Sequence, residues 1–219
     1  MTYPPEPWHL RGSMHLSLWQ LPAAELPAAP VDPVLIGGRG LVGTTWVDYG
    51  PGSVLEYHEL LSAVLVRHDG RLRVHITDIW VDSAASLRGG RELWGIPKES
   101  ARFRFRGSAG DVGSSRAAGF AADGIASAGF TRNAALPGRI PFGYEIVQEL
   151  AGRLLPSPVR GTTSADWCAA AWRFEPGGPL ARLAGREPVA SLALRDFRMD
   201  FGAAAGTRRD GDHWPPPGR

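Results

Sequence analysis

Short runs in which apolar and polar residues alternate recur along this chain, separated by glycine and proline turns. The clearest run is 102–106, where two phenylalanines face one side and three arginines face the other. A period of two residues is the mark of a β-strand with one buried face. Residues 57–68 and 72–81 flank an Asp69-Gly70 turn and are expected to form a β-hairpin. The pattern therefore predicts a mainly β protein.

About ten strands are expected in all, with little helix between them. The other candidate strands cover residues 14–19, 41–48, 116–121, 125–131, 142–150, 167–174 and 188–199. Helix is expected only over 83–93 and in a short turn at 179–185, where a proline begins the segment and a glycine ends it. Many short strands with so little helix predict a β-barrel or β-sandwich in one domain.

The two ends of the chain differ from its middle. Seven prolines within the first 33 residues exclude a long helix there and predict an extended, proline-rich N-terminal arm. Residues 203–219 are rich in Ala, Gly and Pro and are expected to form a flexible tail. The predicted domain therefore covers residues 1–202.

Composition excludes several classes of function. With 43% hydrophobic residues and eight tryptophans, the 219-residue chain can bury a core. Its formal charge is only +2, and the one dense basic spot, Arg208-Arg209, is followed by an acid, which argues against nucleic-acid binding. No apolar run reaches the roughly 18 residues that a membrane helix requires. A single cysteine, Cys168, excludes an internal disulfide and a thiolate metal site. We expect a soluble, cytoplasmic protein without a metal.

One lysine, Lys98, stands among 23 arginines. Such a chain uses arginine wherever either cation suffices, so Lys98 marks a position where arginine may not serve, unless it survived by chance. A lysine amine can lose its proton and attack a carbonyl to form a Schiff base, whereas a guanidinium stays charged. The local sequence must decide between these two readings.

The setting of Lys98 favours chemistry. It ends the run Gly-Gly-Arg-Glu-Leu-Trp-Gly-Ile-Pro-Lys, whose glycines allow close approach of backbones. Trp94 and Ile96 are expected to supply apolar walls, and Pro97 fixes the backbone before the lysine. Burial between such walls lowers the pKa of an amine, which is what a nucleophilic lysine requires.

This run, together with Tyr57-His58-Glu59 at the start of the hairpin, resembles the core signature of the acetoacetate decarboxylase superfamily. The similarity is clear over about residues 54–106 and weaker from Trp8 to the strand around Phe197. The resemblance implies a cone-shaped antiparallel β-barrel with a Schiff-base lysine inside it. It also implies a homo-oligomer.

Matched residue by residue, Lys98 takes the nucleophile position and Glu59 that of a barrel carboxylate facing it, while Arg11 matches an arginine at the substrate end. Two departures matter. The decarboxylases carry a second lysine after the nucleophile, where this chain has Glu99, whose charge would raise the pKa of Lys98 unless its side chain points away. A second barrel glutamate has no counterpart, because residues 43–46 read Gly-Thr-Thr-Trp.

The departures favour a lyase of the aldolase-dehydratase type over a decarboxylase. Lys98 would form an iminium with a small keto acid or ketone, Glu59 would move the proton, and no cofactor is expected. Tyr57 shares a strand face with Glu59 and is expected to bind substrate or to fill the core. Trp94, Ile96 and Glu99 complete the expected substrate site.

Three other readings stay open. They are a true β-keto acid decarboxylase, a non-catalytic barrel that binds an apolar ligand beside Trp80 and Trp94, and an assembly protein. For Glu59, the alternative is an ion pair with one of the many arginines. The histidines lack metal-ligand spacing, and the adjacent His58 and Glu59 should face opposite sides of their strand.

Overall fold

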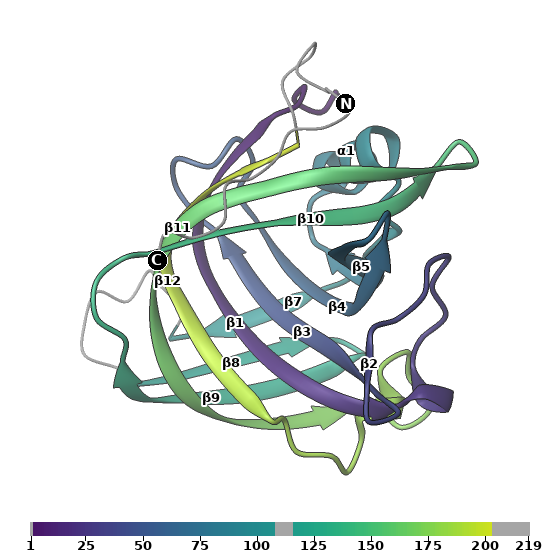
Figure 1. The fold of residues 1–219 in the computed structure, drawn as a ribbon. Coiled ribbons are helices and arrows are strands. Elements are labelled where there is room, and N and C mark those ends of the chain that lie inside the picture. Colours follow the sequence, from purple (N-terminus) through teal and green to yellow (C-terminus); the bar gives the residue numbers. More distant parts are fainter. Residues whose placement is uncertain (1, 108–115, 203–219) are drawn as a thin grey trace.

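The computed structural model describes residues 2–107 and 116–202, and within them the protein is mainly β (Figure 1). The strands are β1 (Trp8–Pro22), β2 (Leu35–Ile36), β3 (Arg39–Tyr49), β4 (Tyr57–His68), β5 (Arg71–Val81), β6 (Lys98–Ser100), β7 (Phe103–Arg106), β8 (Ala117–Ala122), β9 (Ala126–Ala135), β10 (Ile140–Leu150), β11 (Arg153–Phe174) and β12 (Ala190–Phe201). The helical elements are α1 (Ala84–Trp94) and two single 3₁₀ turns, η1 (Ala23–Glu25) and η2 (Ala181–Leu183).

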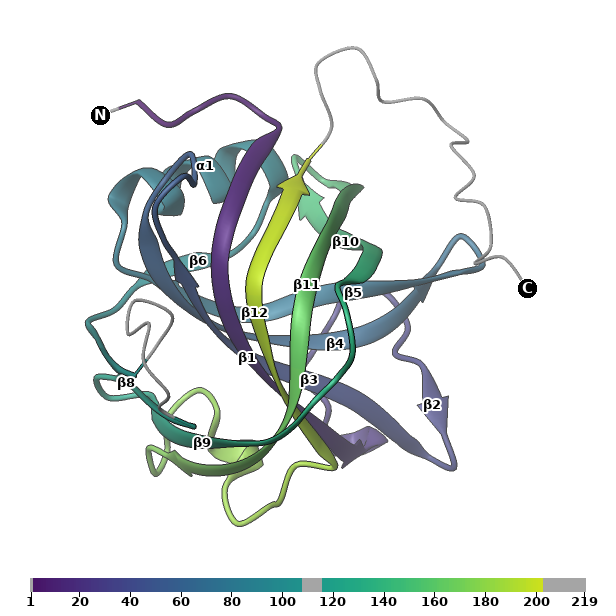
Figure 2. The same ribbon diagram turned by 90° about the vertical axis from the view of Figure 1, so that its left-hand side faces the viewer.

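Seven of the strands form a closed ring. Their hydrogen-bonded order is β10-β5-β4-β3-β1-β12-β11, and a further pairing of β10 with β11 closes the circle. All neighbours in the ring are antiparallel except β5 and β10. Figures 1 and 2 show α1 at the end of this ring where β1 begins. The predicted barrel is therefore confirmed.

Side chains hold the seam between β5 and β10. Only one residue pair, Val74 with Ile146, is in strand register there. Just after this pair on both strands, the His75 ring contacts the carbonyl of Val147 at 2.9 Å, and the Gln148 amide donates to the carbonyl of Ile76 at 3.0 Å. These bonds satisfy backbone groups that a short strand pairing leaves over.

A second layer covers the outside of the ring. Strands β9, β8 and β7 continue the sheet from β11 and fold over the outer face of β3 and β4. Trp46 is fully buried at the centre of this layer, stacked on Phe120 and on Trp172 with 5.7 Å between ring centroids in each case. The alternating 102–106 run supplies β7, and its phenylalanines pack inward as predicted.

Alternation along β4 decides what lies inside the barrel. Tyr57 and Glu59 line the interior cavity, whereas His58 points outward and bonds to Asp82 at 2.7 Å. Leu60 packs into the outer layer beside Trp46. One face of β4 therefore lines the cavity, and the other face packs against the outer layer.

The predicted elements agree with the structure in kind and differ in length. The 57–68 and 72–81 hairpin and the 83–93 helix are confirmed within a residue at each end. Strands β1 and β11 are much longer than predicted, and the short β2 and β6 were not predicted, because two or three residues carry no period. Residues 203–219, predicted as a tail, lie outside the described residues. Among the described residues, no helix is long and apolar enough to cross a membrane.

We expect His15 to make the fold acid-sensitive. Its ring lies in the outer layer, 7% exposed, with ring centroids 4.7 Å from Phe120 and 5.0 Å from Phe130. Burial, and then the charge of Arg132, lower the pKa of His15 from 6.5 to about 4. Below pH 6.5, His15 becomes protonated in the unfolded chain but stays neutral in the folded one. The free energy of unfolding should therefore fall by up to about 3 kcal/mol by pH 4.

Urea unfolding between these pH values tests this expectation. His15→Phe should show a shallower loss of stability on acidification than the wild-type protein. Equal slopes for the wild-type protein and His15→Phe would contradict the assignment.

Candidate functional site

Lys98 reaches the barrel interior through a helix and a short strand. The helix α1 follows β5, and β6 then pairs in parallel with β5, so that Lys98 lies beside Ile79. The lysine side chain is buried, with the whole residue 4% exposed. Its neighbour Glu99 faces the opposite side of the strand and is exposed.

The two ends of α1 fix the position of the backbone that carries Lys98. Ser83 caps the helix, its hydroxyl accepting a hydrogen bond from the backbone of Ser86. Gly95 ends the helix at φ 68°, and a Cβ there would lie 2.1 Å from the carbonyl oxygen of Glu149, so only glycine fits. Arg91 then donates from Nε to the Lys98 carbonyl at 2.7 Å. The Gly-Ile-Pro-Lys segment is therefore held at both ends.

The lysine amine has three oxygen partners. Its Nζ donates to Glu59 Oε2 at 2.8 Å, to Ser86 Oγ at 2.8 Å and to the Tyr57 hydroxyl at 3.3 Å. The other carboxylate oxygen of Glu59 accepts from the Tyr49 hydroxyl at 3.1 Å. Glu59 is 3% exposed, and it pairs with the single lysine, so the alternative of an arginine partner is wrong.

Charge outweighs burial at the amine. Burial is the largest influence and lowers the pKa of Lys98, but the Glu59 carboxylate, the Tyr57 hydroxyl and the hydrogen bonds to both raise it above its ordinary value. The expected lowering of the pKa is therefore not found, and Glu59 favours the ammonium form of Lys98. Burial, and then Glu59, raise the pKa of Tyr57 to about 12, so that its hydroxyl keeps its proton.

Two adjacent glycines of α1 make room for the site. A Cβ on Gly90 would lie 2.7 Å from Cδ and 2.8 Å from Cε of Lys98. A Cβ on Gly89 would lie 2.5 Å from the Trp8 ring. The glycine pair in the sequence signature thus has a steric cause, because the lysine stem lies against the helix backbone.

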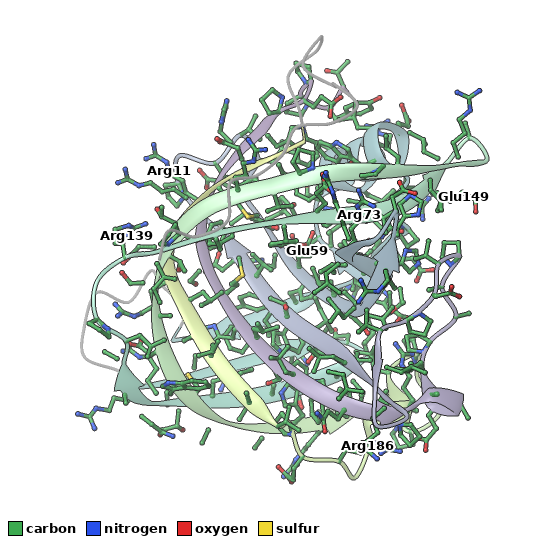
Figure 3. All side chains as sticks on the ribbon, in the orientation of Figure 1. Arg11, Glu59, Arg73, Arg139, Glu149 and Arg186 are labelled. Carbon is green, nitrogen blue, oxygen red and sulfur yellow. The ribbon has the colours of Figure 1, made fainter. Side chains whose placement is uncertain are left out.

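The amine opens into an apolar cavity of about 440 Å³ inside the ring. Its walls come from nearly every strand of the ring, and Figure 3 shows Glu59 within it. Lys98 and Glu59 are the only charged side chains among the described residues that line it. The tyrosines Tyr49 and Tyr57 lie near the pair, stacked with 4.4 Å between their ring centroids.

The structure brings together most of the residues expected from the sequence. Tyr57, Trp94 and Ile96 line the cavity with Lys98 and Glu59. Trp94 also donates from its indole to Glu6 at 2.9 Å, which ties the N-terminal segment to α1.

Other expected residues lie elsewhere. Arg11 is exposed on the outside of the barrel (Figure 3), because it follows the inward-facing Leu10 on β1. Glu99 likewise lies outside and accepts a hydrogen bond from Trp80 at 3.2 Å. Trp80 belongs to the outer layer and does not line the cavity.

Three neighbours of the lysine were not expected from the sequence. Ser86 lies three residues into the predicted helix, and only the helix period could have placed it on the same face as Gly89 and Gly90. Tyr49 shares the inner face of β3 with Val47, but nothing local marks it as a partner of Glu59. Trp8 is the first residue of β1, and its ring centre lies 6.0 Å from the amine.

Within residues 2–107 and 116–202, no group of three or more His, Cys, Asp and Glu side chains is arranged to hold a metal ion. The chemistry that this arrangement offers is that of an amine, a carboxylate and three hydroxyls beside an apolar cavity.

The fold and the site together define a β-barrel protein with a buried lysine–carboxylate pair. The family model of acetoacetate decarboxylase (ADC) matches residues 14–124, just over half of the chain and including both members of the pair. The chain belongs to the acetoacetate decarboxylase family. No curated protein matches it.

Solved structures show the same fold. Acetoacetate decarboxylase from Legionella pneumophila is 17% identical, with a TM-score of 0.63 over 92% of this chain and 86% of that one. The enduracididine biosynthesis enzyme MppR, complexed with the condensation product of pyruvate and imidazole 4-carboxaldehyde, is 16% identical, with a TM-score of 0.59 over 91% of this chain and 88% of that one. An acetoacetate decarboxylase-like enzyme from Sphingomonas wittichii RW1 is 16% identical, with a TM-score of 0.59 over 91% and 92%.

We expect Glu59→Gln to lower the pKa of Lys98 below that of an ordinary lysine. The substitution removes the carboxylate charge and leaves burial as the largest influence on the amine. Because the chain has one lysine, protein labelled with ¹³C at the lysine ε-carbon gives a single lysine signal to follow against pH. Asp200→Asn, which removes an exposed carboxylate, is the control. An unchanged Lys98 titration in Glu59→Gln would contradict the role given to the carboxylate.

We expect Gly90→Ala to fold and yet to displace the amine. Alanine favours a helix over glycine by about 1 kcal/mol, but its methyl group would occupy the space of the lysine stem. The single lysine signal should shift and its titration should change. Gly119→Ala, at a position with open space around it, should change neither. A Gly90→Ala spectrum identical to the wild-type spectrum would show that the Lys98 side chain accommodates the methyl group, and would contradict this prediction.

Proposed function

We propose that this protein is a Schiff-base lyase in which Lys98 forms an iminium with a ketone or keto acid. The observation that carries the proposal is the Lys98 amine, buried at the wall of an apolar cavity 2.8 Å from the Glu59 carboxylate. The match of the acetoacetate decarboxylase family to the segment that holds both residues supports it.

The first step is a proton transfer inside the pair. The ammonium of Lys98 passes a proton along its 2.8 Å hydrogen bond to Glu59, which leaves a neutral amine. The amine attacks the substrate carbonyl carbon, and the carbonyl π electrons move to oxygen. That oxygen takes a proton from the acidic form of Glu59 or from the nitrogen.

Loss of water completes the iminium. The carbinolamine oxygen takes its second proton from whichever of the nitrogen and the Glu59 acid did not give the first. It then leaves as water, while the lone pair of the deprotonated nitrogen forms the C=N bond and Glu59 is again a carboxylate. The hydroxyls of Ser86 and Tyr57 flank the amine and can hold the departing oxygen by hydrogen bonds. The high pKa of Tyr57 keeps its proton available for such a bond.

The iminium then accepts an electron pair from a bond next to the former carbonyl carbon. Breaking a C–H bond gives an enamine for aldol addition or loss of water, and breaking a C–C bond to a carboxylate gives decarboxylation. We favour the aldolase-dehydratase course, because position 99 holds an exposed glutamate and no second cation lies beside the nucleophile in the cavity lining that the structure describes.

Borohydride trapping with a panel of ketones and keto acids tests the proposal. We expect one reduced adduct on Lys98, located by peptide mass spectrometry, whose mass shows whether carboxylate was lost before reduction. Lys98→Arg should give no adduct, because a guanidinium does not attack carbonyls. A wild-type protein without any adduct, beside a family decarboxylase that is trapped under the same conditions, would overturn the Schiff-base proposal and favour a non-covalent binding barrel.

A further inference from the structure

The cavity extends far beyond the reacting pair, and we infer that the substrate carries a long apolar tail behind its carbonyl group. This inference rests on the proposed function, which places the carbonyl carbon at Lys98. It differs from the small keto acid expected from the sequence.

The length of the cavity comes from β4. After Glu59, the inward-facing residues of this strand are Leu61, Ala63 and Leu65, and all three line the cavity. At about 3.3 Å per residue, the six steps from Glu59 to Leu65 cover roughly 20 Å along the strand. A small keto acid at Lys98 would leave most of this length empty.

The neighbouring strands continue the same apolar wall. In register with Ala63 lies Gly43 of β3, and in register with Gly43 lies Leu18 of β1. Leu41, two residues further from the pair along β3, lines the far part of the cavity together with Leu65. Strand β12 adds Leu192.

The charges lie at one end only. Lys98 and Glu59 are the only charged residues in the described lining, and no arginine or histidine faces the cavity. A second carboxylate or phosphate on the substrate would lose its hydration there without gaining a partner, at a cost of several kcal/mol. The walls therefore match a ligand with one polar head and an alkyl tail.

Gly43 leaves space at the middle of the tail region. A Cβ placed there would lie 3.5 Å from Leu16 and 3.7 Å from Leu18, which is ordinary van der Waals contact. A larger side chain at position 43 would therefore project into the cavity without meeting backbone. It stands on β3 six residues before Tyr49, well away from Lys98 and its oxygen partners.

A chain-length series measures the tail directly. Straight-chain methyl ketones from butanone to undecanone would be trapped on Lys98 with cyanoborohydride, and the ketone concentration for half-maximal trapping would be compared. Each added methylene should lower that concentration by up to about fourfold until the cavity is filled. Equal half-maximal concentrations along the series would overturn the inference and leave the Schiff-base proposal intact.

Variants in the tail region give the matched comparison. Gly43→Leu should weaken trapping of the long ketones at least tenfold and leave butanone unchanged, whereas Gly129→Leu, on the exposed face of β9, should change neither. Leu18→Ala should extend the series to longer ketones, and it keeps the test open if Gly43→Leu does not fold. Equal effects of Gly43→Leu on short and long ketones would contradict the tail site.

Calorimetry with straight-chain primary alcohols separates the two proposals, since alcohols cannot form an imine. Chain-length-dependent binding of alcohols without any trapped ketone would support the apolar-tail site and overturn the Schiff base. Binding of neither alcohols nor ketones would overturn both.

Discussion

The buried ion pair of Lys98 and Glu59 is the interaction on which the site depends. Taking an ammonium and a carboxylate out of water costs several kcal/mol for each ion, and removing one partner of such a pair destabilises a protein by about 3–5 kcal/mol. The fold meets this cost by surrounding the pair with Tyr49, Tyr57 and Ser86, which come from three different elements. The packing of α1 on the barrel is thereby coupled to the charge inside it.

The barrel carries this pair without losing its core because its strands have two faces. Along β3, Val47 and Tyr49 face the cavity, whereas Trp46 faces outward and is enclosed by the aromatic layer of β7, β8, β9 and β11. A hollow barrel gives up interior packing contacts, and such contacts are a large part of what stabilises a small domain. The outer layer restores them, so that the interior can stay open.

The sequence predicts most of the strands, the helix and the pairing of Lys98 with Glu59, because alternation and a rare residue are local signals. It could not place the partners that come from distant elements. Ser86 and Tyr49 meet the pair only once β3, β4 and α1 are assembled, and Arg11 falls outside because strand alternation turns it away. The pKa direction at Lys98 was also beyond the sequence, since burial and the Glu59 charge oppose one another and their balance depends on a 2.8 Å contact.

The proposed tail and the proposed chemistry are linked through solvation. The Glu59 carboxylate raises the pKa of Lys98 and so favours the ammonium, a form that cannot attack a carbonyl. An alkyl tail that fills the cavity would exclude water from the side of the ion pair that faces the cavity. Low polarity disfavours both charged forms together, whereas a neutral amine beside a neutral carboxylic acid loses little there. Binding of an apolar substrate would therefore shift the proton from Lys98 to Glu59 and produce the nucleophile at the moment when the carbonyl is in place.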